Sequence, residues 1–484
     1  MKNGWVDHNN ITADNTVFVL LSFEGPDWYS LAGGLGVRVT NLANTLAQKG
    51  FATHLFFIGS PEGKGDETAN GGKLRLHRWC QWISRYYPHG VYQGENEKLY
   101  DFNESAPRYV AEHIVKPAVS QGKLVVVLGE EWHTAEAMCR LSDLLHREGL
   151  RQKVVMFWNA NNTFSFHRID WKRLSFTTTI TTISRYMKHV MWGIGVNPLV
   201  IPNGIPKTAL NEVDSFASAG FRRSLHADLV LAKVARWDPD KRWLMAIGAI
   251  ARLKARGIRT VLLARGGIEA HGEEVMQKAR SSNLVIKDVT SRGNSLMDYL
   301  EALGDNGGAD ILNIKFHCPP EFLRLVYHAS DAVLANSGHE PFGLVGLETM
   351  AAGGIAFTGC TGEDYASHLH NAVVLETSDP QEIESYVLYL NEHPEEQEKI
   401  RKAGRRTARQ YVWDEVLRIL IDKLEYQARV QKLLAATNNN TNKCHETEPE
   451  DAVEVIESTL VARKFVRRRG TATSTSGTSR LAHC

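Results

Sequence analysis

Two glutamates, Glu340 and Glu348, stand with seven residues between them in a stretch that carries no other charge. An apolar segment leads into this stretch, and a helical pattern with glycines follows Glu340. A carboxylate buried without a partner is costly, so each glutamate needs a group to bind. The turn from strand to helix is where open α/β sheets bind ligands, and N–H groups at a helix start face anions. We therefore expect a phosphorylated ligand with hydroxyl groups, its phosphate facing the N–H groups of Gly343 and Leu344.

Two cations, Arg236 and Lys241, surround an Asp-Pro turn between a predicted strand and the next helix. Paired cations beside a helix N-terminus suit a diphosphate. The helix dipole disfavours a cation at a helix N-terminus, so the position of Lys241 indicates a functional role. The alternative is that both are surface cations paired with Asp238 and Asp240. We interpret these aspartates as turn residues rather than metal ligands, and we predict no metal site.

Three glycines, Gly33, Gly34 and Gly36, follow the first predicted strand and open a helix. Glycine lets the backbone approach a ligand closely and present its N–H groups. The dinucleotide fingerprint is absent because Val39 stands where a further glycine or alanine is needed, and no P-loop lysine follows. A simple tight turn is an equal alternative.

Polar residues after two further strands are candidates for contacts with substrate. His133 follows an apolar strand and is placed to donate or accept a hydrogen bond, although most histidines are structural and the chain has 19. Asn161, Asn162 and His167 lie among aromatic residues, a mixture that suits sugar hydroxyls and sugar faces. An asparagine-rich loop without function is the alternative.

Short β-branched segments alternate with longer helical patterns along most of the chain, which is typical of parallel sheets. The predicted strands span residues 16–23, 53–59, 74–79, 123–129, 153–158, 178–184, 199–201, 230–237, 260–265, 283–288, 311–316, 331–336, 355–358 and 372–375. The predicted helices include residues 37–49, 134–149, 242–256 and 322–329, and one long amphipathic helix over 395–434. The aromatic-rich segment 79–101 is predicted to be a packed hairpin, with a role at an acceptor site as the alternative.

The pattern predicts an α/β fold of two doubly wound, Rossmann-like halves. The turn cluster Pro202-Asn-Gly-Ile-Pro206 is the best boundary between them. We expect an N-terminal domain over 1–206, a C-terminal domain over 207–394, a long helix over 395–436 and a disordered tail over 437–484.

Bulk composition excludes several classes of function. The 56 basic and 55 acidic residues give a net charge of +1, which favours neither a nucleic-acid nor a membrane-surface partner. The six cysteines lack metal-site spacing and predict a reducing compartment. We find neither a signal peptide nor an apolar run of membrane-spanning length, so we expect a cytoplasmic protein. The oligomeric state stays open.

From Thr16 to Leu424 the chain resembles the retaining, nucleotide-sugar-dependent glycosyltransferases of family 4, whose members include glycogen, starch and sucrose-phosphate synthases. The segments that carry the resemblance are Glu340–Glu348 with the following Met-Ala-Ala-Gly, the Arg236 and Lys241 pair, Gly33–Gly36, Trp132-His-Thr-Ala and Ile201-Pro-Asn-Gly. The resemblance implies a GT-B fold, in which two Rossmann-like domains face each other across a cleft.

The resemblance also implies a role for each candidate. The donor diphosphate binds Arg236, Lys241 and the N–H groups after Glu340, while Glu348 accepts hydrogen bonds from the ribose. Glu340 holds sugar hydroxyls near the anomeric carbon, and His133 contacts the sugar. The resemblance implies further donor contacts at Gly33, Gly34 and Gly36, whereas the mixture of asparagines and aromatic residues predicts acceptor contacts at Asn161, Asn162 and His167.

The implied enzyme is a hexosyltransferase that passes a sugar from a nucleotide diphosphate-sugar to a carbohydrate-type acceptor. It needs no metal or other cofactor, because fixed cations and N–H dipoles stabilise the leaving group. The lysine that precedes the glycine loop in the synthases is absent, which weakens polyglucan elongation as the activity. A retaining disaccharide phosphorylase and a non-catalytic sugar-nucleotide-binding protein are the alternatives. The base, the sugar and the acceptor are not predicted.

Overall fold

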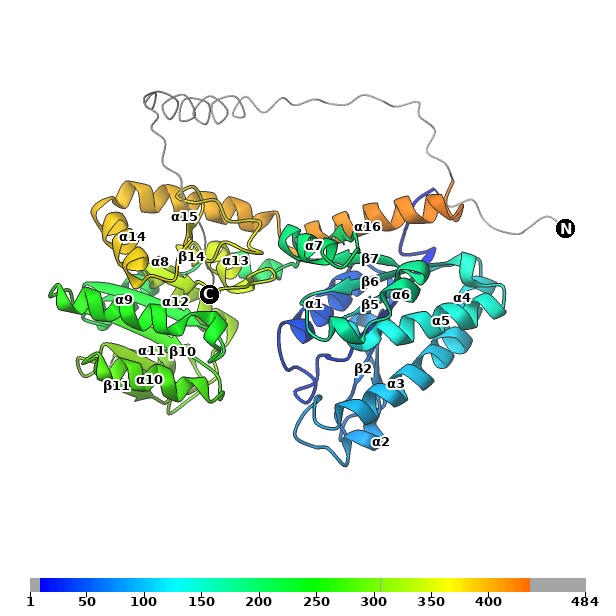
Figure 1. The fold of residues 1–484 in the computed structure, drawn as a ribbon, viewed down its shortest axis with the longest axis horizontal. Helices are drawn as coiled ribbons and strands as arrows, with labels where there is room; N and C mark the ends of the chain where they lie inside the picture. The colour runs from blue at the N-terminus through cyan, green and yellow to red at the C-terminus, as the bar shows by residue number, and fades with distance from the viewer. Residues whose placement is uncertain (1–8, 305, 436–484) are drawn as a thin grey trace, which may run out of the picture. The chain divides into compact units, whose positions relative to one another are not determined.

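The computed structural model describes residues 9–304 and 306–435 (Figure 1). These residues belong to one compact unit that ends at Ala435. The predicted tail over 437–484 lies outside the described residues. Among the residues that are described, no helix is both long enough and apolar enough to cross a bilayer.

The first sheet has the strand order β3-β4-β2-β1-β5-β6-β7-β8 and is parallel except for the β3–β4 pair. Its strands are β1 (Thr16–Leu21), β2 (Ala52–Ile58), β3 (Asp66–Ala69), β4 (Leu74–Trp79), β5 (Leu124–Glu130), β6 (Val154–Ala160), β7 (Thr179–Thr182) and β8 (Leu199–Val200). Its helices are α1 (Gly34–Gln48), α2 (Gln81–Ser84), α3 (Glu95–Val110), α4 (Lys116–Ser120), α5 (Ala135–Arg147), α6 (Trp171–Thr177) and α7 (Arg185–Trp192). We call residues 16–200 the first lobe.

The second sheet has the strand order β11-β12-β10-β9-β13-β14-β15. Its strands are β9 (Leu229–Val234), β10 (Thr260–Arg265), β11 (Ile286–Val289), β12 (Ile311–Ile314), β13 (Ala332–Ala335), β14 (Ala356–Thr358) and β15 (Val373–Val374). Its helices are α8 (Ser215–Ser224), α9 (Trp243–Ala255), α10 (His271–Ser281), α11 (Leu296–Gly304), α12 (Pro320–Ala329), α13 (Leu344–Ala351) and α14 (Pro380–Glu392). We call residues 215–392 the second lobe.

Both sheets are covered on both faces, which explains why their central strands read as continuous apolar runs. In β1, Val17 and Val19 belong to one buried cluster, whereas Phe18 belongs to another. In β9, Leu231 and Ala232 face different clusters in the same way. The chain therefore has two doubly wound α/β halves, as the alternating pattern predicts.

One predicted helix is two helices in the structure. The segment predicted as one helix over 395–434 contains α15 (Pro394–Arg409) and α16 (Trp413–Val430). The backbone leaves helical geometry at Val412, with φ −68° and ψ 150°. Here Ile205 donates to the carbonyl of Tyr411 at 2.9 Å and accepts from the N–H of Trp413 at 3.0 Å. The long-range pairing with Ile205 replaces the local bonds that would have continued the helix.

One further prediction in the first lobe is wrong, and one strand was not predicted. The segment 79–101 is not a hairpin, because it contains the end of β4, the short helix α2 and the start of α3. The edge strand β3 was not predicted, and its residues are exposed or only partly buried. A strand without a buried face has no apolar alternation from which it can be recognised.

Candidate active site

The strand order places the candidate residues at one edge of the second sheet. The order reverses between β9 and β13, and the carboxyl ends of strands at such a switch point are where α/β sheets bind ligands. Arg236 and Lys241 follow β9, while Glu340 lies between β13 and α13. Residues about a hundred positions apart are therefore brought together.

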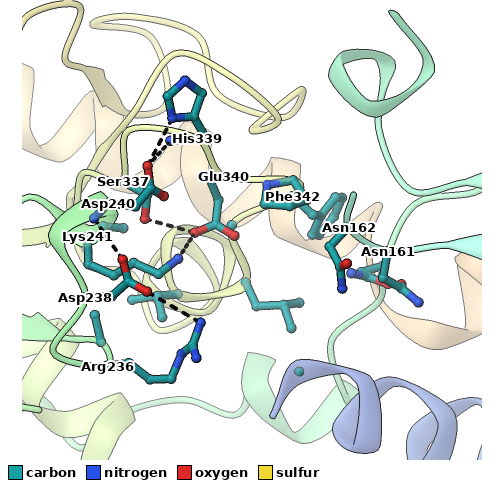
Figure 2. A pocket seen from close by; sticks show the side chains of 18 of the residues that line it. Asn161, Asn162, Arg236, Asp238, Asp240, Lys241, Ser337, His339, Glu340 and Phe342 are labelled. Atoms are coloured by element: carbon teal, nitrogen blue, oxygen red, sulfur yellow. Dashed lines mark hydrogen bonds and ion pairs between the residues drawn. The ribbon is translucent and has the colours of Figure 1, made fainter. Parts of the chain in front are cut away.

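Lys241 and Glu340 form an ion pair, with 2.7 Å between Nζ and Oε2 (Figure 2). Their side chains are only 21% and 20% exposed, so the pair is largely sheltered from solvent. Ser337 Oγ donates to the same carboxylate oxygen at 2.9 Å. The backbone N–H of Glu340 donates to Thr361 Oγ1 at 2.8 Å. Glu340 is thus held through both its side chain and its main chain.

Arg236 remains available to a ligand. Its side chain is 64% exposed and lies 3.9 Å from Asp238, a weak contact at a solvated position. Asp238 Oδ1 also accepts from the N–H of Asp240 at 2.9 Å, as expected of a turn residue. The alternative in which both cations pair with these aspartates therefore fails for Lys241, whose partner is Glu340.

The N-terminus of α13 opens beside this ion pair. Its cap is Gly343, whose φ of +81° is one that other residues rarely adopt. A Cβ at this position would lie 2.7 Å from Glu363 Cγ, so both conformation and packing require glycine. The first N–H groups of a helix have no acceptor within it, and the dipole makes this end attractive to anions.

A pocket of about 660 Å³ unites these groups. The predicted site residues that line it are Gly34, Asn161, Asn162, Arg236, Lys241, Glu340, Gly343 and Leu344. Both lobes contribute to the lining, because Gly34 and the asparagines come from the first lobe. Five predicted residues are not among those lining the pocket: Gly33, Gly36, His133, His167 and Glu348.

The glycine loop differs from expectation in one respect. The N–H groups of Gly33 and Gly36 donate to Glu24 Oε2 at 2.9 and 3.0 Å. Glu24 is buried and also accepts from the hydroxyl of Tyr92. The expected role of these two N–H groups toward a ligand is therefore filled by an internal carboxylate. Only Gly34 of the three faces the pocket.

His133 also has an internal partner. Its Nε2 lies 2.8 Å from Glu95 Oε1, and its ring stacks on Phe23 with 4.2 Å between centroids. Burial lowers the pKa of His133, although Glu95 acts in the opposite direction. Its Nδ1 has no hydrogen-bond partner among the described residues. A contact between His133 and a sugar stays a prediction.

Glu348 and His167 are not among the residues that line the pocket, although Glu348 is close to it. Glu348 follows Leu344 by four residues in α13, so it shares the face of the helix that meets the pocket. Burial raises the pKa of Glu348 to about 7. His167 belongs to a single exposed turn, Phe166–Arg168, beyond the asparagines.

Sequence reasoning missed Lys233, which lines the pocket although it is 1% exposed. It lies inside the apolar strand β9, Leu-Val-Leu-Ala-Lys-Val. A charged residue at an inward position of a buried strand was the available signal. Ser337 and Asn203 also line the pocket and were not assigned roles.

Comparison with known proteins agrees with this geometry. Residues 222–407 match the family model described as Glycosyl transferases group 1. A D-inositol 3-phosphate glycosyltransferase of Thermomonospora curvata is 25% identical over 189 residues, which cover 38% of this chain and 42% of that protein. The match thus spans less than half the length of that relative.

Solved structures extend the likeness to both lobes. Sucrose-phosphate synthase from Thermosynechococcus elongatus has a TM-score of 0.61 and 16% identity, over 86% of this chain and 99% of that one. The Anabaena protein HepE in complex with UDP-glucose has a TM-score of 0.55 and 13% identity, over 85% and 100%. At such identities these likenesses concern the fold.

Fold and site together define a two-lobed α/β protein of the GT-B class. Residues 222–407 resemble the group 1 glycosyl transferases, in agreement with the predicted resemblance to glycosyltransferases of the GT-B class.

Proposed function

We propose that this protein is a retaining glycosyltransferase that moves a hexosyl group from a nucleotide diphosphate-sugar to a hydroxyl of a carbohydrate-type acceptor. The observation that carries the proposal is the Lys241–Glu340 ion pair beside the N-terminus of α13, in one pocket with Arg236. Cations and free N–H groups suit a diphosphate, whereas a fixed carboxylate suits sugar hydroxyls. A nucleotide diphosphate-sugar carries both a diphosphate and sugar hydroxyls, and few other ligands do.

The diphosphate of the donor binds Arg236, Lys241 and the N–H groups of Gly343 and Leu344. Leaving-group charge then develops where fixed positive groups already stand, so their reorganisation costs little. This arrangement supplies the stabilisation for which other enzymes use a metal ion. Glu348 takes the ribose hydroxyls, because it continues the pocket-facing side of α13 beyond Leu344.

Glu340 orients the donor sugar at the anomeric carbon. Its hydrogen bonds from Ser337 and Lys241 hold the carboxylate in place at the pocket. A negative group at this place stabilises an oxocarbenium-like transition state. The acceptor attacks from the leaving-group side, as the family resemblance implies, so the configuration at that carbon is retained.

The acceptor hydroxyls face Asn161 and Asn162 across the pocket. Asn161 Nδ2 donates to Glu130 Oε2 at 3.0 Å, and its Oδ1 has no partner among the described residues. A buried amide oxygen without a donor suits a hydroxyl group from a substrate. Neutral, hydroxyl-rich acceptors are therefore preferred on this side.

The proposal is tested by a mass-spectrometric screen of UDP-, ADP- and GDP-sugars with mixed small acceptors and glucans, in the presence of EDTA. We expect transfer by the wild type and a loss of at least about a hundredfold for Glu340→Gln, the scale of one missing stabilising group. Glu415→Gln, an exposed change on α16, serves as the matched control.

Other outcomes would replace the proposal. Full activity of Glu340→Gln would contradict the role of that carboxylate. Phosphate-dependent breakdown of a disaccharide without any response to nucleotides would identify a phosphorylase. Nucleotide binding without transfer to any acceptor would identify a binding protein.

A further inference from the structure

Lys233 is a buried cation that lines the candidate donor site. It is the fifth residue of β9 and points to the same side as Leu231, within the apolar core beneath α9. Only 1% of the residue is exposed, yet it borders the pocket that holds Lys241 and Glu340. A lysine in this position is expensive unless its charge is compensated.

The protein offers Lys233 only neutral partners. Its Nζ donates to the carbonyl of Leu334 at 3.0 Å and to Asn336 Oδ1 at 2.5 Å. It also lies 5.2 Å from the centroid of the Trp243 ring. Among the described residues no carboxylate forms an ion pair with it. An ammonium group has three N–H donors, so these two oxygens leave one donor without an acceptor.

Another buried lysine shows how the same fold satisfies such a group. Lys98 in the first lobe is 0% exposed, and no carboxylate among the described residues forms an ion pair with it. Its Nζ donates to four oxygens, those of the Tyr29 hydroxyl and the Gly90, Val91 and Gln93 carbonyls. Lys98 is therefore fully satisfied by the protein, whereas Lys233 is not.

The charges around Lys233 do not compensate it either. Lys241 and Arg242, at the start of α9, are like charges that together with burial lower the pKa of Lys233. Glu340 acts in the opposite direction, but its carboxylate is already bound to Lys241 and Ser337. Ala264, which pairs with Lys233 on the neighbouring strand β10, carries no charge. Among the described residues, none therefore supplies an unpaired negative charge to the protonated form of Lys233.

We propose that Lys233 is a third cation of the donor diphosphate site and that the phosphates of the bound nucleotide supply the counter-charge which the protein lacks. This inference rests on the proposed function, because it requires a nucleoside diphosphate in the pocket. Lys233 acts from behind Arg236 and Lys241, and it is a positioning residue that need not touch the sugar. It also couples donor binding to protonation, because an approaching anion favours the charged form of a lysine.

The test is calorimetric titration of the wild type with UDP at about pH 8, where the phosphates of the nucleotide are already ionised. Repeating the titration in buffers of different ionisation enthalpy gives the number of protons taken up. We expect net uptake by the wild type, and both reduced uptake and a Kd about tenfold higher for Lys233→Met. Lys98→Met, which removes an equally buried lysine away from the pocket, should bind UDP with unchanged proton uptake.

The proton uptake measured for the wild type and the two variants decides whether the inference holds. Uptake that falls in Lys233→Met but not in Lys98→Met supports the inference. UDP binding without proton uptake, or equal uptake by the wild type and Lys233→Met, overturns it and leaves the proposed function standing. If Lys233→Met fails to fold, the proton uptake of the wild type on UDP binding still tests the inference, because this measurement needs no variant. If UDP, ADP and GDP all fail to bind, the proposed function falls together with it.

Discussion

At the scale of single residues, the site depends on how Glu340 is held. The turn that contains Glu363 also holds the backbone of Glu340, because Gly362 donates its N–H to the carbonyl of Glu340 at 2.8 Å. Glu363 itself is 5% exposed, and its Oε1 has no partner among the described residues. Burial, with the charge of Glu340 as a second cause, raises the pKa of Glu363 to about 8. Glu363 is therefore a neutral acid below that pH.

This raised pKa has a consequence for stability. The folded protein keeps a proton that the unfolded chain releases above its ordinary pKa of 4.5, so the free energy of unfolding falls as pH rises from that value to about 8. Glu363→Gln removes the titration. We expect it to stabilise the protein relative to wild type by about 2–4 kcal/mol above this window and by nearly nothing below it.

Urea unfolding across the pH range measures this difference. The same substitution at the exposed Glu376 is the control and should give no pH-dependent difference. A stability difference for Glu363→Gln that does not change with pH would contradict the neutral state of this carboxyl.

Residues that follow strands could be placed from the sequence, and residues that depend on tertiary contacts could not. Arg236, Lys241 and Glu340 follow apolar strands, so their meeting at one sheet edge was predictable. The hydrogen bonds from the glycine loop to Glu24 could not be predicted, because they depend on the path of the loop between β1 and α1. Loop geometry of this kind has no periodic signal in the sequence.

At the scale of elements, helix α16 packs the C-terminal part of the described chain against the first lobe. Its apolar face, which includes Leu417, Leu420 and Leu424, shares a buried cluster with β1. The helix was foreseen from its spacing, but its start was not, because the break before Trp413 comes from backbone pairing with Ile205. Local periodicity reports a buried face, and it cannot report a long-range pairing that interrupts the helix.

Trp413 tests the importance of this junction. It is 3% exposed, and a Cβ on Gly204 would lie 2.7 Å from its ring, so the two residues are in tight contact. We expect Trp413→Ala to lower the free energy of unfolding by about 3–5 kcal/mol, the usual loss for a buried aromatic side chain. Tyr426→Ala, on the exposed side of the same helix, should cost less than about 0.5 kcal/mol.

Thermal or chemical unfolding of both variants checks this prediction. Equal stability of Trp413→Ala and Tyr426→Ala would mean that the contact between α16 and the first lobe contributes little. Such a result would not affect the candidate donor site, because Lys233, Arg236 and Lys241 all belong to the second lobe.

At the scale of the whole molecule, both sheets have a reversal of strand order, and the loops beside each reversal contribute residues to the same pocket. In the first sheet the order reverses between β1 and β5, and in the second between β9 and β13. The glycine loop and His133 follow the first pair, whereas the cations and Glu340 follow the second. The positions of most strands along the chain could be predicted from the sequence, because buried parallel strands are apolar throughout. The side chains that line the pocket could not all be predicted from the sequence. His133 is an example, because its Nε2 lies against Glu95 within the first lobe.

We expect the pocket to bind a nucleoside diphosphate through its cations without a metal ion. Titration calorimetry with UDP in the presence of EDTA tests it most directly, on the wild type, Lys241→Met and the control Lys254→Met, which changes an exposed lysine of the same lobe. The account predicts binding by the wild type and the control, with a Kd at least about tenfold higher for Lys241→Met. Equal affinity of Lys241→Met and the wild type, or binding that requires a divalent cation, would contradict it.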